Sequence, residues 1–308
     1  MHTTPACGGI SSMRRVTACI LMTTWMTGAT WALPSVDEYQ SKYRNIDRPL
    51  PCLEILMEIK QELLGQPRIA QSNQAPGYTL DTADVPVLSS TVYGYMTEGK
   101  VRRVRTEEVN LRTGGVTLKD IAIDDSSRRE LYIPPEGTPP YLMTSPGKSL
   151  LRDDALPLYA YFTRVHISPA DLLFDSDDEL EFRLYNSLAL PEVVDEGMRQ
   201  VDDCSYHAIR VGRYCRYYFD LGTRMLRRYE KLTKKGKDLS AIWELDDYKP
   251  VENADLLLPR LVRITDYAGG RAARRITIRV IIARATRSKM SLGSMPFHVP
   301  SGTMEVLK

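Results

Sequence analysis

The sequence has few of the residues, and none of the motifs, that usually carry catalysis or metal binding. Its 308 residues include only four histidines and five cysteines. No histidine lies within four positions of another and no Cys-x-x-Cys pair occurs, so the ligand spacing of zinc sites is missing. Gly-x-Ser-x-Gly and glycine-rich phosphate loops are missing too. We predict no cofactor, no metal and no enzymatic activity. The alternative is a hydrolase in which His166, His207 or His298 meets a serine or aspartate only in the fold.

The chain also lacks an excess of either charge and a long apolar run. It carries 41 Lys and Arg against 39 Asp and Glu. Without residues 1–32, which contain Arg14 and Arg15 and no acid, the balance becomes 39 against 39. A neutral chain has no general attraction for nucleic acid, so no nucleic-acid partner is predicted. No apolar run reaches the roughly 18 residues of a transmembrane helix, so no membrane anchor is predicted.

The N-terminal segment is typical of export. Arg14 and Arg15 precede an apolar run over 16–26, and small residues stand at Thr30 and Ala32. A basic start, a short apolar core and a small-residue cleavage site define a secretory signal peptide. We therefore predict residues 1–32 as a signal peptide, 33–308 as the mature domain, and a periplasmic or secreted location. A buried N-terminal helix is the alternative.

Three cysteines remain after residue 32, namely Cys52, Cys204 and Cys215. An odd number allows at most one internal bridge. A two-residue turn at Gly212-Arg213 predicts that Cys215 faces Arg210 across a hairpin, which separates it too far from Cys204 for a bridge. Whether any disulfide forms among the three stays open.

Two regions predict helices. Ser35 with Glu38 forms a capping box, which predicts a helix over 36–47. Pro51 followed by apolar residues spaced three or four apart predicts a second helix over 52–64. Further capping signals predict helices over about 168–188. Residues 66–87 are polar and rich in Pro and Gly, which predicts a linker.

Alternating apolar residues predict strands in two further regions. The first contains 91–96, 100–109 and 128–133, followed by a loop over 134–158. The second is a ladder over 201–211, 214–220, 224–233, 240–248, 261–267 and 275–286. Ile276, Ile278 and Val280 alternate with polar residues there, as in a half-buried antiparallel strand.

Three segments of the C-terminal region resemble a known family. Tyr217–Glu230, Leu256–Tyr267 and Met295–Val306 resemble the strands and the ending of periplasmic lipoprotein carriers of the LolA/LolB-like superfamily. The resemblance implies an unclosed β-barrel of about eleven antiparallel strands, with helices as a lid in its concave face. Members of the superfamily carry the acyl chains of lipoproteins. This chain differs in its length, chiefly through an inserted segment over about 134–196.

We therefore predict an α+β fold, a highly curved antiparallel sheet with N-terminal and central helices as a lid. The predicted function is non-enzymatic binding of an apolar ligand, with an acyl chain or a lipoprotein as the partner. The alternative is a cell-envelope structural or protein-interaction module without a cavity, whose partner is another envelope protein. Strand alternation gives these candidates for the cavity wall: Tyr206, Tyr218, Trp243, Leu245, Val262, Ile264, Ile278, Val280 and Phe297.

Overall fold

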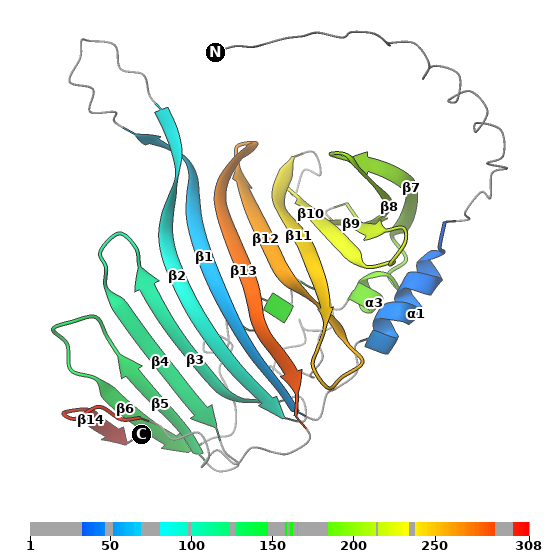
Figure 1. Cartoon of the computed structure of the whole chain (residues 1–308). Helices are drawn as coiled ribbons and strands as arrows, with labels where there is room; N and C mark the ends of the chain where they lie inside the picture. The colour runs from blue at the N-terminus through cyan, green and yellow to red at the C-terminus, as the bar shows by residue number, and fades with distance from the viewer. Residues whose placement is uncertain are drawn as a thin grey trace, which may run out of the picture. The chain divides into compact units, whose positions relative to one another are not determined.

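One large sheet contains all the strands that the computed structural model describes (Figure 1). The described residues are 33–46, 52–68, 81–97, 100–123, 127–146, 158, 161–162, 165, 184–213, 215–233, 238–286 and 298–307. Pro34–Lys308 forms one compact unit. The strands are β1 Cys52–Arg68, β2 Asp81–Thr97, β3 Lys100–Asn110, β4 Val116–Ile123, β5 Ser127–Ile133, β6 Tyr141–Pro146, β7 Val193–Val201, β8 Cys204–Val211, β9 Cys215–Asp220, β10 Leu226–Leu232, β11 Leu239–Pro250, β12 Leu257–Ala268, β13 Arg271–Ala285 and β14 Met304–Leu307.

The sheet is curved and open. Its strand order is β14-β6-β5-β4-β3-β2-β1-β13-β12-β11-β10-β9-β8-β7, so β14 and β7 are its two edges. All neighbours are antiparallel except β14 and β6, which run parallel. The prediction of a curved, unclosed antiparallel sheet is confirmed. The sheet has 14 strands in the described part of the chain, more than the roughly eleven that the family resemblance implies.

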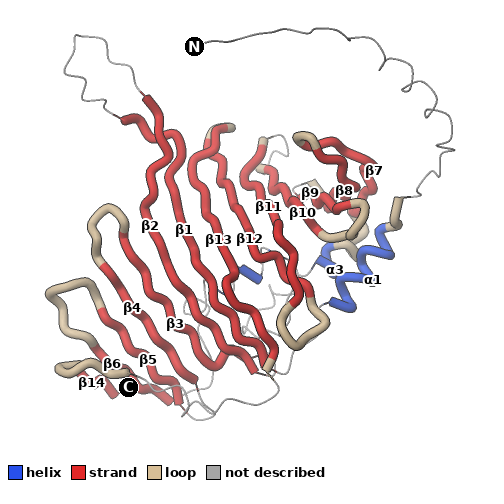
Figure 2. The backbone as a smooth tube through the Cα atoms, in the orientation of Figure 1, coloured by secondary structure: helices blue, strands red, loops and turns tan. Residues whose placement is uncertain are grey.

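The largest correction concerns residues 52–64, where a helix was predicted and the structure has β1 (Figure 2). Leu53, Ile55, Met57 and Ile59 occupy every second position, with Glu54 and Glu58 among the residues between them, so the segment satisfies period two as well as helical spacing. β1 lies in the middle of the sheet, between β2 and β13. Pairing along both edges satisfies the backbone of β1 and buries its apolar side chains, which overrides the local helical pattern.

Two other regions differ from prediction in extent. The predicted loop over 134–158 contains β6, and the predicted linker over 66–87 is shortened because β1 extends to Arg68 and β2 begins at Asp81. Helix α3 covers Leu184–Ser187, inside the helical region predicted over 168–188. Residues 166–183 lie outside the described part.

Locally encoded features were predicted well. Helix α1 spans Val36–Ile46, and the Ser35 hydroxyl accepts the amide N–H of Glu38 at 3.3 Å, as a capping box requires. Gly269 and Gly270 turn between β12 and β13 with φ values of 57° and 77°, which suit a tight hairpin. The Gly212 hairpin is one residue out of the predicted register, because Cys215 pairs with Val211 and not with Arg210. The three cysteines after residue 32 are free.

The hydrophobic core lies on one face of the sheet, which we call the inner face. The opposite face is the outer face. The core cluster extends along the inner face from β3 to β8 and includes Val104, Val92, Ile55, Val280, Val262, Trp243, Tyr229, Phe219 and Ile209. Side chains from α1, from helical residues between 158 and 165, and from α3 join this cluster. We call these three elements the lid. The lid therefore covers an apolar surface that the strands present.

Candidate functional site

Six of the nine predicted cavity residues form one apolar patch on the inner face. They are Trp243, Leu245, Val262, Ile264, Ile278 and Val280, and each is at most 5% exposed. Their strands place them side by side, because Trp243 pairs with Ile264, Leu245 with Val262, and Val262 in turn with Ile278. Paired residues in neighbouring strands project from the same face. The patch therefore spans β11, β12 and β13 without a polar interruption among these six.

Two of the predicted cavity residues, Tyr206 and Tyr218, lie on the outer face and not on the inner face. Tyr217 and Tyr229 pair with each other and belong to the core cluster, so Tyr218 projects from the opposite face. Tyr206 pairs with Asp220, which shares the outer face with Tyr218. A run of two tyrosines does not show which of them faces inward, and a shift of one residue in register exchanges the faces. Phe297, the ninth candidate, lies outside the described residues.

The lid lies close against this patch and the neighbouring strands. The Tyr161 hydroxyl donates a hydrogen bond to the carbonyl oxygen of Pro259 in β12 at 2.8 Å, and Tyr161 is fully buried. Leu158 sits over Gly94 in β2, where an added Cβ would lie 2.5 Å from its Cδ1. Glycine at position 94 therefore lets the lid approach the backbone of the sheet. The apolar patch is filled from above by side chains of the chain itself.

Helix α1 is fastened at the other end of the patch by aromatic rings and a few hydrogen bonds. The Tyr39 ring stacks on Phe219 with centroids 4.1 Å apart. The Tyr43 hydroxyl accepts the amide N–H of Leu226 at 2.6 Å. The Tyr39 hydroxyl lies 3.1 Å from Nδ1 of the fully buried His207. Few polar contacts would have to break for α1 to leave the sheet.

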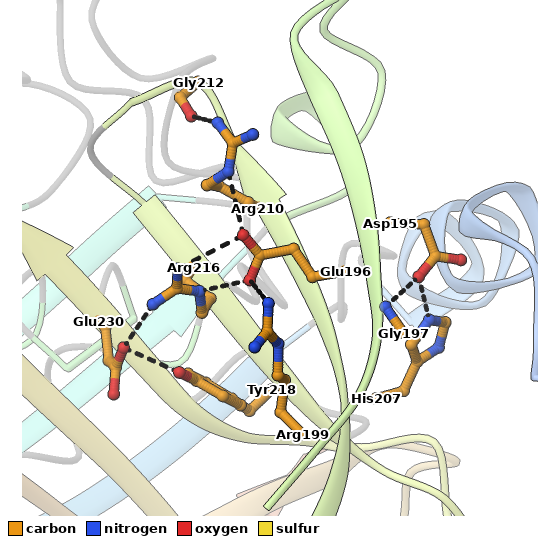
Figure 3. Close-up of polar contacts among 10 residues, drawn as sticks. All are labelled: Asp195, Glu196, Gly197, Arg199, His207, Arg210, Gly212, Arg216, Tyr218 and Glu230. Carbon is orange, nitrogen blue, oxygen red and sulfur yellow. Dashed lines mark hydrogen bonds and ion pairs between the residues drawn. The ribbon is translucent and has the colours of Figure 1, made fainter. Parts of the chain in front are cut away.

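His207 links the lid to the edge strand β7. Its Nε2 lies 2.7 Å from Oδ1 of Asp195, which also accepts the amide N–H of Gly197 at 2.8 Å (Figure 3). Burial acts to raise the pKa of Asp195, but the hydrogen bonds from His207 and Gly197 outweigh it and lower that pKa. Burial raises the pKa of Tyr39 to about 12, so its hydroxyl stays protonated. The hydrolase alternative required His207 to meet a serine or aspartate in the fold, and Asp195 does so, but His207 is fully buried. The two partners in this array, Asp195 and Tyr39, could not be named from the sequence, because they lie 12 and 168 residues from His207.

The outer face carries a second polar group of side chains in the same region (Figure 3). Glu196 accepts hydrogen bonds from Nε of Arg210 at 3.1 Å and from Nε of Arg216 at 2.7 Å. Glu230 accepts one from Arg216 and one from the Tyr218 hydroxyl, at 3.3 and 2.9 Å. The carboxylates are thus already satisfied by arginines and a tyrosine. We interpret these hydrogen bonds and ion pairs as contacts that hold β7 against its neighbouring strands, and not as a catalytic site.

The arrangement offers no metal centre in the described part of the chain, where no three His, Cys, Asp or Glu side chains gather closely enough to hold an ion. Among the described helices, none has the length and apolar character needed to cross a membrane. The site that remains is the apolar patch with its lid.

Comparison with known proteins adds little. Neither the protein-family models nor the curated proteins contain a match to this sequence. Among solved structures, a LolA superfamily protein from Nitrosomonas europaea is similar over 83% of this chain and 96% of that chain. The sequence identity is 9% and the TM-score is 0.38. At these values the similarity supports no conclusion about a ligand, a partner or a location.

Proposed function

We propose that this protein is an exported, non-enzymatic binding protein that holds an acyl chain, free or attached to a lipoprotein, between its inner face and its lid. The observation that carries the proposal is the continuous apolar patch of Trp243, Leu245, Val262, Ile264, Ile278 and Val280. Short helical elements cover this patch, and no second sheet does so in the described part of the chain. The resemblance of three C-terminal segments to lipoprotein carriers agrees with this function.

Lid side chains belong to the same buried cluster as the patch, so the lid is closed over it. An acyl chain must therefore displace them. Burying about 15 methylenes contributes roughly 12 kcal/mol, at about 0.8 kcal/mol each. Each large apolar side chain of the lid contributes about 1.5–3 kcal/mol to the closed form. The free energy gained by burying one acyl chain is therefore offset when about four to eight such lid side chains lose their contacts.

Seven lid side chains and Leu188, the residue that follows α3, belong to the core cluster; the seven are Tyr39, Tyr43, Leu158, Tyr161, Phe162, Val165 and Leu184. Complete exposure of all eight would cost about as much as one acyl chain gains, or more. Binding thus requires that part of the lid keeps its contacts, or that displaced rings pack again on the chain. We infer a lid that shifts aside and remains attached.

Native mass spectrometry of the protein, exported to and purified from a bacterial periplasm without detergent, tests the proposal. We expect a co-purifying acyl lipid whose mass is lost after denaturation and refolding, and saturable rebinding of hexadecanoate to the refolded protein. Absence of lipid together with absence of rebinding would overturn the proposal. The refolded protein, shown by circular dichroism to regain its strand signal, serves as the matched control.

A second function is favoured by the edge of the sheet. Within the described part of the chain, strand β7 pairs only with β8, and its side chains Val194 and Met198 are 41% and 57% exposed. An exposed edge strand can accept a strand from another protein. The chain would then be an interaction module of the cell envelope, with its inner face permanently filled. If the chain is such a module, site-specific crosslinking from position 198 should give a discrete adduct with one protein. Crosslinking from Val116, an exposed residue on β4, should not.

A further inference from the structure

One arginine on the inner face stands out because its burial is uncompensated. Arg260 lies on β12 between Leu258 and Val262, both of which are fully buried members of the core cluster. Its Nη2 donates to the carbonyl oxygen of Pro250 at 3.0 Å. Its Nε and Nη1 are buried and have no hydrogen-bond partner. Two of the three guanidinium nitrogens therefore lack an acceptor.

Such a group is costly to keep. Buried donors in folded proteins are nearly always satisfied, and an exception needs an explanation. A buried cation without an acceptor destabilises the fold more than a neutral donor does. The bond to Pro250 explains only Nη2. A ligand that brings acceptor oxygens would explain the other two nitrogens.

The surroundings of Arg260 favour an anion. It lines a hollow of about 430 Å³ together with Asp247, Lys249, Leu261, Arg279, Val280 and Ile281. Asp247 is the carboxylate of this hollow, and Lys249 already pairs with it at 2.9 Å. Among the described residues neither Arg260 nor Arg279 has a carboxylate within ion-pair distance. Leu261 and Arg279 pair with each other and alternate with Val262 and Ile278, so they project from the outer face. Arg260 is therefore the cation of this hollow on the side of the apolar patch, and its charge has no counter-ion among the described residues.

Arg260 also lies beside the lid. The positive charge of Arg260 is close enough to Tyr161 to oppose the rise that burial causes in the pKa of that tyrosine. Tyr161 bonds to Pro259, the residue before Arg260. Movement of the lid at Tyr161 would therefore open the apolar patch and the guanidinium together. Arg260 itself lies two residues before Val262, a patch residue, on the same face of β12, so the guanidinium adjoins the patch.

We propose that Arg260 binds the oxyanion of the ligand, a carboxylate or phosphate headgroup whose acyl chain lies on the apolar patch. This inference rests on the proposed function and specifies the class of ligand as an anionic amphiphile. The guanidinium presents planar N–H donors that match carboxylate and phosphate oxygens. Arg260 as a whole is partly exposed, so a headgroup bound to it can reach water while the chain is buried.

Titration of the delipidated full chain with four probes tests the inference. The probes are hexadecanoate, hexadecyl phosphate, hexadecanol, which has the same chain without the anion, and inorganic phosphate. We expect the two anionic amphiphiles to bind about 10- to 100-fold more tightly than hexadecanol, the range for a charged hydrogen bond. In Arg260→Met this preference should disappear while the affinity for hexadecanol stays the same, and Arg260→Lys should retain part of it.

The matched control is Arg263→Met, because Arg263 is an exposed arginine on the outer face of the same strand. It should leave all affinities unchanged. Thermal unfolding separates a binding role from a structural one. Arg260→Met should unfold at the same or a higher temperature, since it removes two buried donors without partners and loses only the one hydrogen bond to Pro250. A markedly lower unfolding temperature would show a structural role and overturn the inference.

The remaining outcomes distinguish this inference from the proposed function. Equal affinity of the wild-type protein for hexadecanoate and hexadecanol would overturn the inference and leave the proposed function intact. Failure of all amphiphiles to bind would overturn the proposed function. If inorganic phosphate still binds and its binding depends on Arg260, the oxyanion site stands, with a free anion as its ligand. If inorganic phosphate does not bind either, the oxyanion site is overturned as well.

Discussion

Removal of one hydroxyl from the lid should weaken the fold and strengthen binding. Tyr43 on α1 is 1% exposed, and its hydroxyl accepts the amide N–H of Leu226, which is fully buried. Tyr43→Phe keeps the ring and its edge contact with Phe219, whose centroid is 6.1 Å away. The substitution removes only the acceptor and leaves a buried N–H without it.

The magnitude follows from that unmet donor. An unsatisfied buried donor costs about 1–3 kcal/mol. In the open form water can reach the amide of Leu226, so the penalty falls on the closed form alone. The ratio of closed to open molecules then falls by roughly 5- to 150-fold. While the closed form predominates, the apparent dissociation constant for an acyl ligand falls by the same factor.

Two assays on the same variant check this prediction. Chemical denaturation should show a loss of about 1–3 kcal/mol in the free energy of unfolding, and titration with hexadecanoate should show tighter binding. Tyr267→Phe, at the end of β12 and away from the lid, is the control and should change neither quantity. If Tyr43→Phe lowers stability while binding weakens or stays the same, α1 is not a displaceable cover and the reasoning is refuted.

Three further predictions concern the lid, the core and acid stability. Gly94→Ala should lower the free energy of unfolding by about 1–3 kcal/mol, because the new Cβ would meet Leu158. In a double-mutant cycle measured by denaturant unfolding, the same substitution should cost less in the Leu158→Ala background than in the wild type. Equal costs in the two backgrounds would contradict the contact. Asp120→Asn should lower the free energy of unfolding by about 1–3 kcal/mol, since it replaces the buried carboxylate that accepts hydrogen bonds from Arg103 with a neutral amide; a loss within the few tenths of a kcal/mol typical of weak exposed pairs would argue against it. Asp195 has a lowered pKa, so the stability it contributes is complete above its unfolded pKa of about 4 and is lost as pH falls through its lower folded pKa. When the free energy of unfolding is measured against pH, its slope below about pH 4 should be shallower in Asp195→Asn than in the wild type. An unchanged slope would remove Asp195 from the array.

The sequence predicts those parts of the fold whose signals are local. The capping box at Ser35 and the glycine pair at 269–270 determine their neighbours' conformation directly, and the structure confirms both. β1 was mistaken for a helix because its apolar residues satisfy both periodicities. Only its pairing with β2 and β13, which are distant in sequence, decides in favour of the strand.

The same limit applies to the candidate site. Regular alternation along β11–β13 indicates which residues share the inner face, and six of them lie together. The doublet Tyr217-Tyr218 breaks that alternation, so the face of Tyr218 depends on a register that turn chemistry placed one residue away. The approach of Tyr39 to His207 and the unmet donors of Arg260 depend on long-range packing, for which no local pattern exists.

The position of the ligand can be measured through Trp243. The chain has three tryptophans, Trp25, Trp31 and Trp243, and Trp243 lies buried in the apolar patch. In the full chain with Trp25→Phe and Trp31→Phe, all tryptophan fluorescence reports from that patch. Titration with dibromostearate, against stearate as control, should quench this fluorescence saturably, and stearate should compete the quenching away. Saturable binding of stearate without quenching by its brominated analogue, or no binding at all, would contradict the account of an acyl chain held under the lid.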